Sequence, residues 1–243
     1  MFSSVIQPPV LGLFSSSATY ALTPPLFEVT VDAALPEDSF VCLLGDHSSL
    51  PLPAGTALLA PDPQYKAVLH RVLHIQSPTL RKTYLRCPAS GSQGLGIKLP
   101  WLHLQVRNLE RAWSFELGLV DVRGQKGRVR FSTFQGEAKA YACDPPLLHM
   151  PFQFPEITSA TRTLWLTIDV HLPPLLGHLS SASSLLPVFA DKQAPLVPFT
   201  SFSHISYVKV YANCRLRRIW FSHDGDSDGP TGAFELKLYS GST

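Results

Sequence analysis

Residues 224–235, with the sequence DGDSDGPTGAFE, have the ligand spacing of a calcium-binding loop. The carboxylate ligands would be Asp224, Asp226, Asp228 and Glu235. Loops of this kind lie between two helices, whereas residues 219–221 and 234–239 have the apolar composition of strands. Thr231 also stands where such loops usually have an apolar residue. We therefore expect an acidic hairpin loop that holds no metal ion.

The remaining motifs that could support catalysis are incomplete. Gly91, Gly94 and Gly96 precede Lys98, but a phosphate-binding loop needs Lys directly after Gly and then Ser or Thr. The nine histidines include no HExxH pattern, the four cysteines include no CxxC pair, and no serine lies in a GxSxG turn. The sequence therefore predicts a protein that is not an enzyme and needs no cofactor.

Two short basic clusters are candidates for binding an acidic partner. Leu216 and Ile219, in the acid-free stretch ANCRLRRIWFS at residues 212–222, cannot both face the core of a regular strand. We therefore predict a β-bulge near Arg217 that turns neighbouring guanidinium groups outward. The stretch is either a charged edge strand exposed to water or a docking strip. The candidate residues of both clusters, on expected neighbouring strand edges, are Arg215, Arg217, Arg218, Lys126, Arg128 and Arg130.

Charge is distributed unevenly along the 243 residues. Residues 1–65 contain 6 acids and no Lys or Arg, whereas the rest of the chain has 20 basic against 12 acidic residues. This modestly basic body suits an acidic partner, but it lacks the dense basic stripe of a dedicated nucleic-acid binder. Only 16% of residues are charged, which favours extensive burial against other proteins.

Signals for secretion and membrane insertion are lacking. The first residues carry no cationic start, and Pro8 and Pro9 interrupt their apolar stretch. Neither Asn108 nor Asn213 begins a glycosylation sequon, and no apolar run approaches the length of a membrane span. We expect a soluble, cytoplasmic protein with no membrane partner.

Strand-like alternation of apolar and polar residues dominates the chain. It is clearest at residues 27–31, 40–44, 83–87, 102–106, 113–122, 128–131, 164–172 and 207–212. Residues 68–76 fit a strand or a short helix. With no amphipathic helices between the strands, the pattern predicts a single-domain, all-β antiparallel sandwich or jelly roll. We place the sandwich at residues 66–243, with the Pro-rich, acidic residues 1–65 packed on it.

Residues 173–204 look like an insertion, because they are rich in Pro, Leu and Ser and almost uncharged. Two interpretations remain open: a poorly ordered loop, or a segment that a partner covers. The partner-contact candidates are Leu185, Leu186, Val188 and Phe189. In both cases, deleting residues 175–198 should leave the sandwich folded, because surface insertions cost little closure entropy.

Three phrases resemble the cilia- and flagella-associated protein 20 family. They are residues 87–109 (CPASGSQGLGIKLPWLHLQVRNL), residues 212–222, and residues 234–239 (FELKLY), in the same order as in the family. The resemblance covers residues 66–172 and 205–240 and marks a divergent member. It implies a β-sandwich structural protein at the inner junction of axonemal doublet microtubules, or at a related basal-body position. The implied partners are α/β-tubulin, which the basic clusters would contact, and parkin co-regulated protein.

Aromatic residues leave two rival functions open. Trp101, Trp165 and Trp220 fall opposite or beside the apolar faces of their strands. On an open face they could stack on sugars, as in a carbohydrate-binding module, although we expect the second sheet to bury them. Arg218 near Trp220, and Arg130 near Phe131, also permit nucleic-acid binding, which is the third choice.

Overall fold

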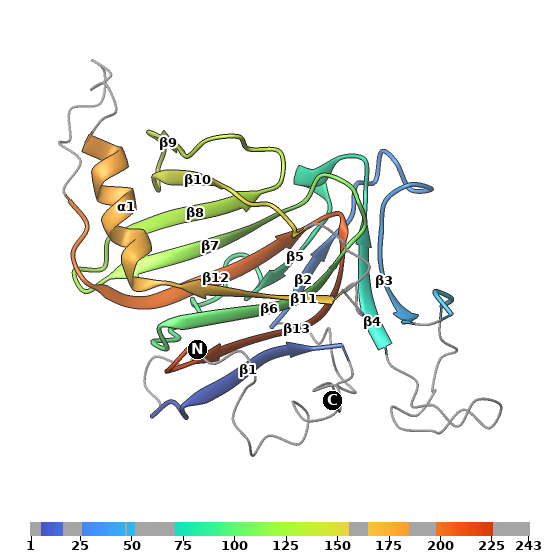
Figure 1. Ribbon diagram of the computed structural model, residues 1–243, viewed down its shortest axis with the longest axis horizontal. Helices are drawn as coiled ribbons and strands as arrows, with labels where there is room; N and C mark the ends of the chain where they lie inside the picture. Colours follow the sequence, from blue (N-terminus) through green and yellow to red (C-terminus); the bar gives the residue numbers. More distant parts are fainter. Residues whose placement is uncertain are drawn as a thin grey trace.

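Two β-sheets make up most of the computed structural model, which describes residues 6–16, 26–46, 48–51, 71–155, 165–184 and 198–225 (Figure 1). Sheet A has the order β11 (Trp165–His171), β6 (Trp101–Asn108), β13 (Cys214–Ser222), β4 (Arg71–Gln76) and β3 (Phe40–Gly45), and β1 (Val10–Ser15) also pairs with β13. Sheet B has the order β2 (Glu28–Thr30), β5 (Tyr84–Cys87), β12 (Phe202–Tyr211), β7 (Ser114–Asp121), β8 (Lys126–Ser132), β10 (Leu147–Pro151) and β9 (Lys139–Tyr141). A short 3-10 helix, η1 (Leu80–Lys82), precedes β5. The predicted all-β sandwich is confirmed.

The alternation in the sequence decides which side chains lie between the sheets. Leu102, Leu104 and Val106 of β6 are fully buried in the core, as are Phe115 and Leu117 of β7. Residues between these positions point to the outer faces, because successive side chains of a strand point to opposite sides. Each sheet therefore has an outer face of mainly polar residues, and these faces are where partners can bind.

The predicted β-bulge in β13 is confirmed. The register of β13 against β6 shifts between Leu216 and Arg218, so Arg217 is the extra residue. Leu216 and Ile219 are both buried in the core, which the bulge makes possible despite their odd spacing. The strand is not at an edge, since β6 lies on one side of it and β4 and β1 lie on the other.

Part of the expected insertion is a helix that belongs to the core. α1 (Pro173–Ser184) begins with proline, which suits the first helical turn. Leu175, Leu176 and Leu179 form a helical stripe within the hydrophobic core, and α1 lies against the β8–β10–β9 side of sheet B (Figure 1). Gly127 makes room for it, because a Cβ there would be 2.9 Å from Leu179 Cδ1. The expectation that residues 173–204 form a surface insertion is therefore wrong for α1 and for the first residues of β12.

The first 65 residues contribute strands to both sheets. β1 and β3 belong to sheet A, and β2 is an edge strand of sheet B. Phe14 and Phe27 contact each other edge to face within the core, at a centroid distance of 5.7 Å. The sandwich thus includes three strands from the described parts of this segment, whereas the sequence placed its start at residue 66. Within the described ranges, no helix has both the length and the apolar composition to cross a membrane.

Candidate partner-binding face

A row of charged and titratable side chains crosses all seven strands of sheet B on its outer face. Each member stands directly opposite the next in the strand register. With strands about 4.8 Å apart, the row is about 29 Å long. We call it the charged row. From β2 to β9 its members are Glu28, Arg86, Lys209, Glu116, Arg130, His149 and Lys139.

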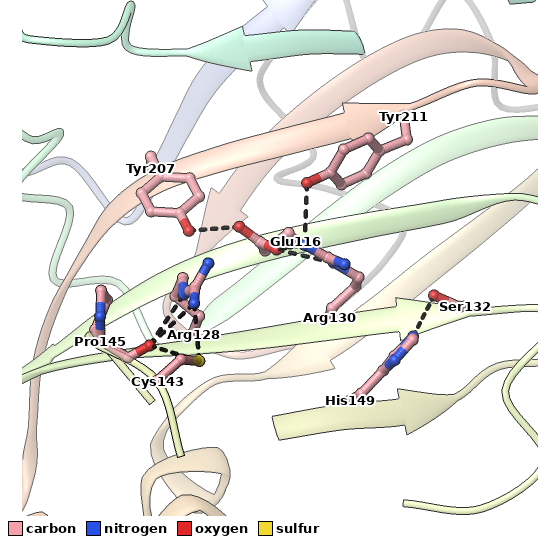
Figure 2. Close-up of polar contacts among 9 residues, drawn as sticks. All are labelled: Glu116, Arg128, Arg130, Ser132, Cys143, Pro145, His149, Tyr207 and Tyr211. Atoms are coloured by element: carbon pink, nitrogen blue, oxygen red, sulfur yellow. Dashed lines mark hydrogen bonds and ion pairs between the residues drawn. The ribbon is translucent and has the colours of Figure 1, made fainter. Parts of the chain in front are cut away.

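Glu116 on β7 is the buried centre of this row (Figure 2). Arg130 forms an ion pair with its Oε2, and the Tyr207 hydroxyl donates a 2.6 Å hydrogen bond to its Oε1. Burial alone would raise the pKa of Glu116, but the charge of Arg130 and the Tyr207 hydrogen bond outweigh it and hold the pKa below its usual value. Burial and the adjacent Glu116 raise the pKa of Tyr211 to about 12. The centre is therefore a fixed carboxylate whose charge is already balanced.

Tyrosine rings flank the charged row and hold its cations. The Lys209 ammonium lies 3.5 Å from the centroid of the Tyr84 ring and 4.8 Å from that of Tyr211. The Arg86 guanidinium lies 4.2 Å from the centroid of the Tyr207 ring. Such cation–π contacts are each worth about 0.5–1 kcal/mol at exposed sites. The rings thus keep positive charge on the face without neutralising it.

Arg86 and Lys209 are like charges in direct register on β5 and β12. Burial, together with the nearby cations Arg86 and Arg130, lowers the pKa of Lys209 to about 8 against the opposing effect of Glu116 and Glu28. This part of the face therefore has more positive charge than its own acids balance.

The predicted β8 cluster lies on the same outer face. Lys126 is exposed, and Arg128 is half-buried beside the 143–145 loop, where it donates to the Pro145 carbonyl at 3.1 Å and contacts Cys143 Sγ at 3.1 Å (Figure 2). Arg130 is the partner of Glu116. β8 is an interior strand of sheet B and not an edge, so the expected edge position of this cluster is wrong.

The β13 arginines lie on the outer face of the other sheet and are buried. Arg215, Arg217 and Arg218 are only 8%, 8% and 5% exposed. Arg215 and Arg217 both form ion pairs with Asp46, and the Arg217 guanidinium lies 3.9 Å from the centroid of the Trp165 ring. The bulge turns these side chains away from the core as predicted, but the loop after β3 and Trp165 cover them. The structure therefore does not bring the two predicted basic clusters together.

A hydrogen-bonded Ser–His–Asp chain that was not predicted from the sequence lies on the outer face of sheet A. Ser222 Oγ is 2.7 Å from His103 Nε2, and His103 Nδ1 is 2.6 Å from Asp169 Oδ1. The three residues are on adjacent strands but far apart in sequence. Ser222 is 2% exposed, and the N–H of His223, a candidate oxyanion donor, donates instead to the Pro9 carbonyl. This arrangement fits a structural link between three strands and not a nucleophile that a substrate can reach.

Trp101, Trp165 and Trp220 also lie on the outer face of sheet A, and not between the sheets as expected. Trp101 stacks on His171 at 4.4 Å, Trp220 stacks on His103 at 4.9 Å, and Trp165 stacks under Arg217. Each ring therefore has at least one face already occupied by a neighbour.

Most candidate residues of the calcium loop and all four partner-contact candidates lie outside the residues that the structure describes. Of the calcium-loop candidates only Asp224 is described, and Asp226, Asp228 and Glu235 lie outside the described residues, as do Leu185, Leu186, Val188 and Phe189. In the described parts of the chain, no group of three or more His, Cys, Asp or Glu side chains could hold a metal ion.

The most positively charged part of this face, on β5 and β12, was not among the residues predicted from the sequence. The alternation YVKVY at residues 207–211 places Tyr207, Lys209 and Tyr211 on one side of a strand, and YLR at 84–86 does the same for Tyr84 and Arg86. The alternation that assigns these residues to one face is therefore visible in both segments. Recognising it required knowing that these two strands are neighbours, which the sequence does not reveal.

Comparisons with known proteins agree with the family resemblance of the sequence. Residues 64–176 match the model of the CFA20 domain. Cilia- and flagella-associated protein 20 of Chlamydomonas reinhardtii is 29% identical over 170 residues, which cover 69% of this chain and 73% of that protein. The proteins of the same name from Caenorhabditis elegans and Caenorhabditis briggsae are 25% identical over 168 residues, covering 69% of this chain and 68% of theirs. The resemblance of this chain to the cilia- and flagella-associated protein 20 family is thus confirmed, with a match to the CFA20 domain and similarity to these relatives over about two thirds of the chain.

Proposed function

We propose that this chain is a non-catalytic structural protein of the ciliary or flagellar axoneme, and that it binds tubulin at the inner junction of the doublet microtubule. The names of its relatives imply a role associated with cilia and flagella. Parkin co-regulated protein is a further expected neighbour by family resemblance. A related basal-body position would use the same surface.

The observation that carries this proposal is the outer face of sheet B. It brings six cations, Lys126, Arg128, Arg130, Lys139, Arg86 and Lys209, together with two acids, Glu28 and Glu116. Tubulin is acidic, and a rigid sheet with excess positive charge complements such a surface. Each exposed charge pair contributes only about 0–1 kcal/mol, so many copies along a repeating lattice would supply the rest of the affinity.

Co-sedimentation with microtubules tests this assignment. The double variant Arg86→Glu with Lys209→Glu should lose most binding, because it reverses two neighbouring cations that form no ion pair with the described residues. The matched control reverses Lys98 and Arg111, two exposed loop cations, and gives the same total change in charge. It should bind like the wild type. Equal loss in both variants, or no loss in either, would overturn the assignment to this face.

The rings of sheet B argue against carbohydrate binding. Sugar-binding platforms need open aromatic faces on which a sugar ring can stack. The rings of Tyr84, Tyr207 and Tyr211 already carry the cations of Lys209 and Arg86. A blank result on a glycan array is therefore the expected outcome, and it would separate the two functions.

A further inference from the structure

The Arg86–Lys209 pair places two cations next to each other in the charged row, between Glu28 and Glu116. The two side chains stand directly opposite each other on β5 and β12, a position in which like charges repel. Among the residues that the structure describes, their charged groups make cation–π contacts with Tyr84, Tyr207 and Tyr211 and form no ion pair, and Arg86 Nε donates a 3.2 Å hydrogen bond to the Pro88 carbonyl. The pair is also only half-buried, so an incoming group can reach it.

The two acids on either side of this pair in the charged row are already engaged. Glu28 accepts a 3.1 Å hydrogen bond from the Tyr84 hydroxyl and a 2.7 Å hydrogen bond from the Ser90 amide. Glu116 accepts from Arg130 and from the Tyr207 hydroxyl. Both carboxylates are thus fixed by other donors, and the charge of the Arg86–Lys209 pair is left for a partner.

We propose that Arg86 and Lys209 together bind a carboxylate side chain from an extended, glutamate-rich segment of a partner protein. This site rests on the proposed function and deepens it, because it names the chemistry of the contact. Arg128 on β8 is a further cation of the face without an ion pair among the described residues, two to three strands away and two residues along the strands, or about 12–16 Å. Glutamates four residues apart in an extended chain are separated by about 13 Å. One segment can therefore reach both positions.

The chemistry of the face favours a polypeptide over a nucleic acid. Proteins that bind single-stranded DNA or RNA stack its bases on exposed aromatic rings. Here the rings of Tyr84 and Tyr207 are covered by Lys209 and Arg86. A carboxylate needs only the two cations for binding. Arg and Lys can each donate a hydrogen bond to one of its two oxygens.

Lys209 should make the affinity of this site for a carboxylate depend on pH. The charged groups that face it are Arg86 on β5, Glu116 on β7, Arg130 on β8 and Glu28 on β2. With a pKa of about 8, Lys209 is largely protonated at pH 7 and largely neutral at pH 9. A carboxylate binds the protonated form, and glutamates stay ionised over this range. The affinity should therefore fall about tenfold between pH 7 and pH 9.

A labelled synthetic peptide tests the site on the full chain. The probe carries glutamates at positions i and i+4 in a Gly/Ser background, and its control carries glutamines at the same positions. Fluorescence anisotropy should show binding of the glutamate peptide only, with the tenfold loss between pH 7 and pH 9. Lys209→Arg, which keeps its charge at pH 9, should bind at both pH values. Lys98→Arg changes an exposed loop lysine outside this face, and its affinity for the peptide should fall between pH 7 and pH 9 as much as that of the wild type.

Three results would overturn the site: equal affinity for the peptide at pH 7 and pH 9, a Lys209→Arg variant whose affinity depends on pH as much as that of the wild type, or equally tight binding of a single-stranded RNA of matched charge.

Failure of the tubulin assignment would give a different pattern of results. If the peptide binds as expected but the Arg86→Glu, Lys209→Glu variant still sediments with microtubules, the carboxylate site stands and its partner is another acidic protein. If microtubules need these residues but the peptide does not bind, the site is wrong and the microtubule contact stands.

Discussion

The Tyr207 ring lies directly on the backbone of Gly118: a Cβ atom at position 118 would be 2.3 Å from Tyr207 Cε1. Gly118→Ala should therefore push the ring off the sheet and break its hydrogen bond to Glu116. We expect a loss of about 1–3 kcal/mol in the free energy of unfolding, typical of overpacking. Urea unfolding measures it. Gly12→Ala, at a strand glycine with nothing within 4 Å of the added Cβ, is the control and should cost much less.

Asp46 joins three strands of sheet A. It forms ion pairs with Arg215 and Arg217 of β13 and Arg107 of β6, and it accepts a 3.1 Å hydrogen bond from Trp165 Nε1 of β11. Asp46→Ala removes the carboxylate that these cations share, and removing one partner of a buried pair costs about 3–5 kcal/mol.

Because Asp46 is 18% exposed, the lower end of that range, about 3 kcal/mol, is expected. The measurement is the free energy of unfolding in urea. Asp38→Ala, at an exposed acid, should change it by less than about 0.5 kcal/mol. Similar values for the two variants would show that Asp46 does not hold the arginines in place.

The two sheets could be predicted because apolar and polar residues alternate clearly along their strands. The β-bulge could be predicted from the odd spacing of Leu216 and Ile219 alone, because no information about the neighbouring strands was needed. The burial of Arg215 and Arg217 could not be predicted in the same way. It depends on Asp46, which is about 170 residues distant and lies near them only because β3 and β4 extend sheet A on that side.

The charged row shows the same limit on the other sheet. Each strand reveals its own outward residues, but the row exists only through the strand order β2-β5-β12-β7-β8-β10-β9. That order joins Glu28, Arg86 and Lys209, which lie far apart in the sequence. Residues of one strand can be assigned to a face from alternation, whereas a site built across strands requires the topology.

The helix α1 should be essential for folding, contrary to the expectation from the sequence. Leu176 and Leu179 are each 1% exposed, so Leu176→Ala and Leu179→Ala should each lower the free energy of unfolding by about 2–5 kcal/mol. Deleting residues 175–198 removes both leucines and should abolish the cooperative unfolding transition. His178→Ala, on the exposed side of the helix, is the control and should have little effect. A deletion variant that unfolds cooperatively like the wild type would contradict this role.

Lys209 should reduce stability at neutral pH. Burial and the nearby Arg86 and Arg130 lower its pKa from 10.5 in the unfolded chain to about 8 in the folded protein. The folded state therefore disfavours the charged form, and this penalty is present in full below pH 8. Between pH 8 and pH 10.5 the unfolded state binds more protons, so stability due to Lys209 rises with pH until the penalty is lost.

Lys209→Met removes the charge and keeps most of the apolar side chain. At pH 7 the variant should be more stable than the wild type by about 1 kcal/mol at most, because solvent screens the half-exposed ammonium and its cation–π contacts with Tyr84 and Tyr211 oppose the penalty. The advantage should disappear by pH 10.5. Urea unfolding of both proteins at pH 7 and pH 10.5 measures this difference. A variant that is less stable than the wild type by the same amount at both pH values would show that Lys209 contributes packing alone. A gain at pH 7 together with lost binding of the glutamate peptide would instead mean that the fold keeps this lysine, at a cost in stability, for its partner.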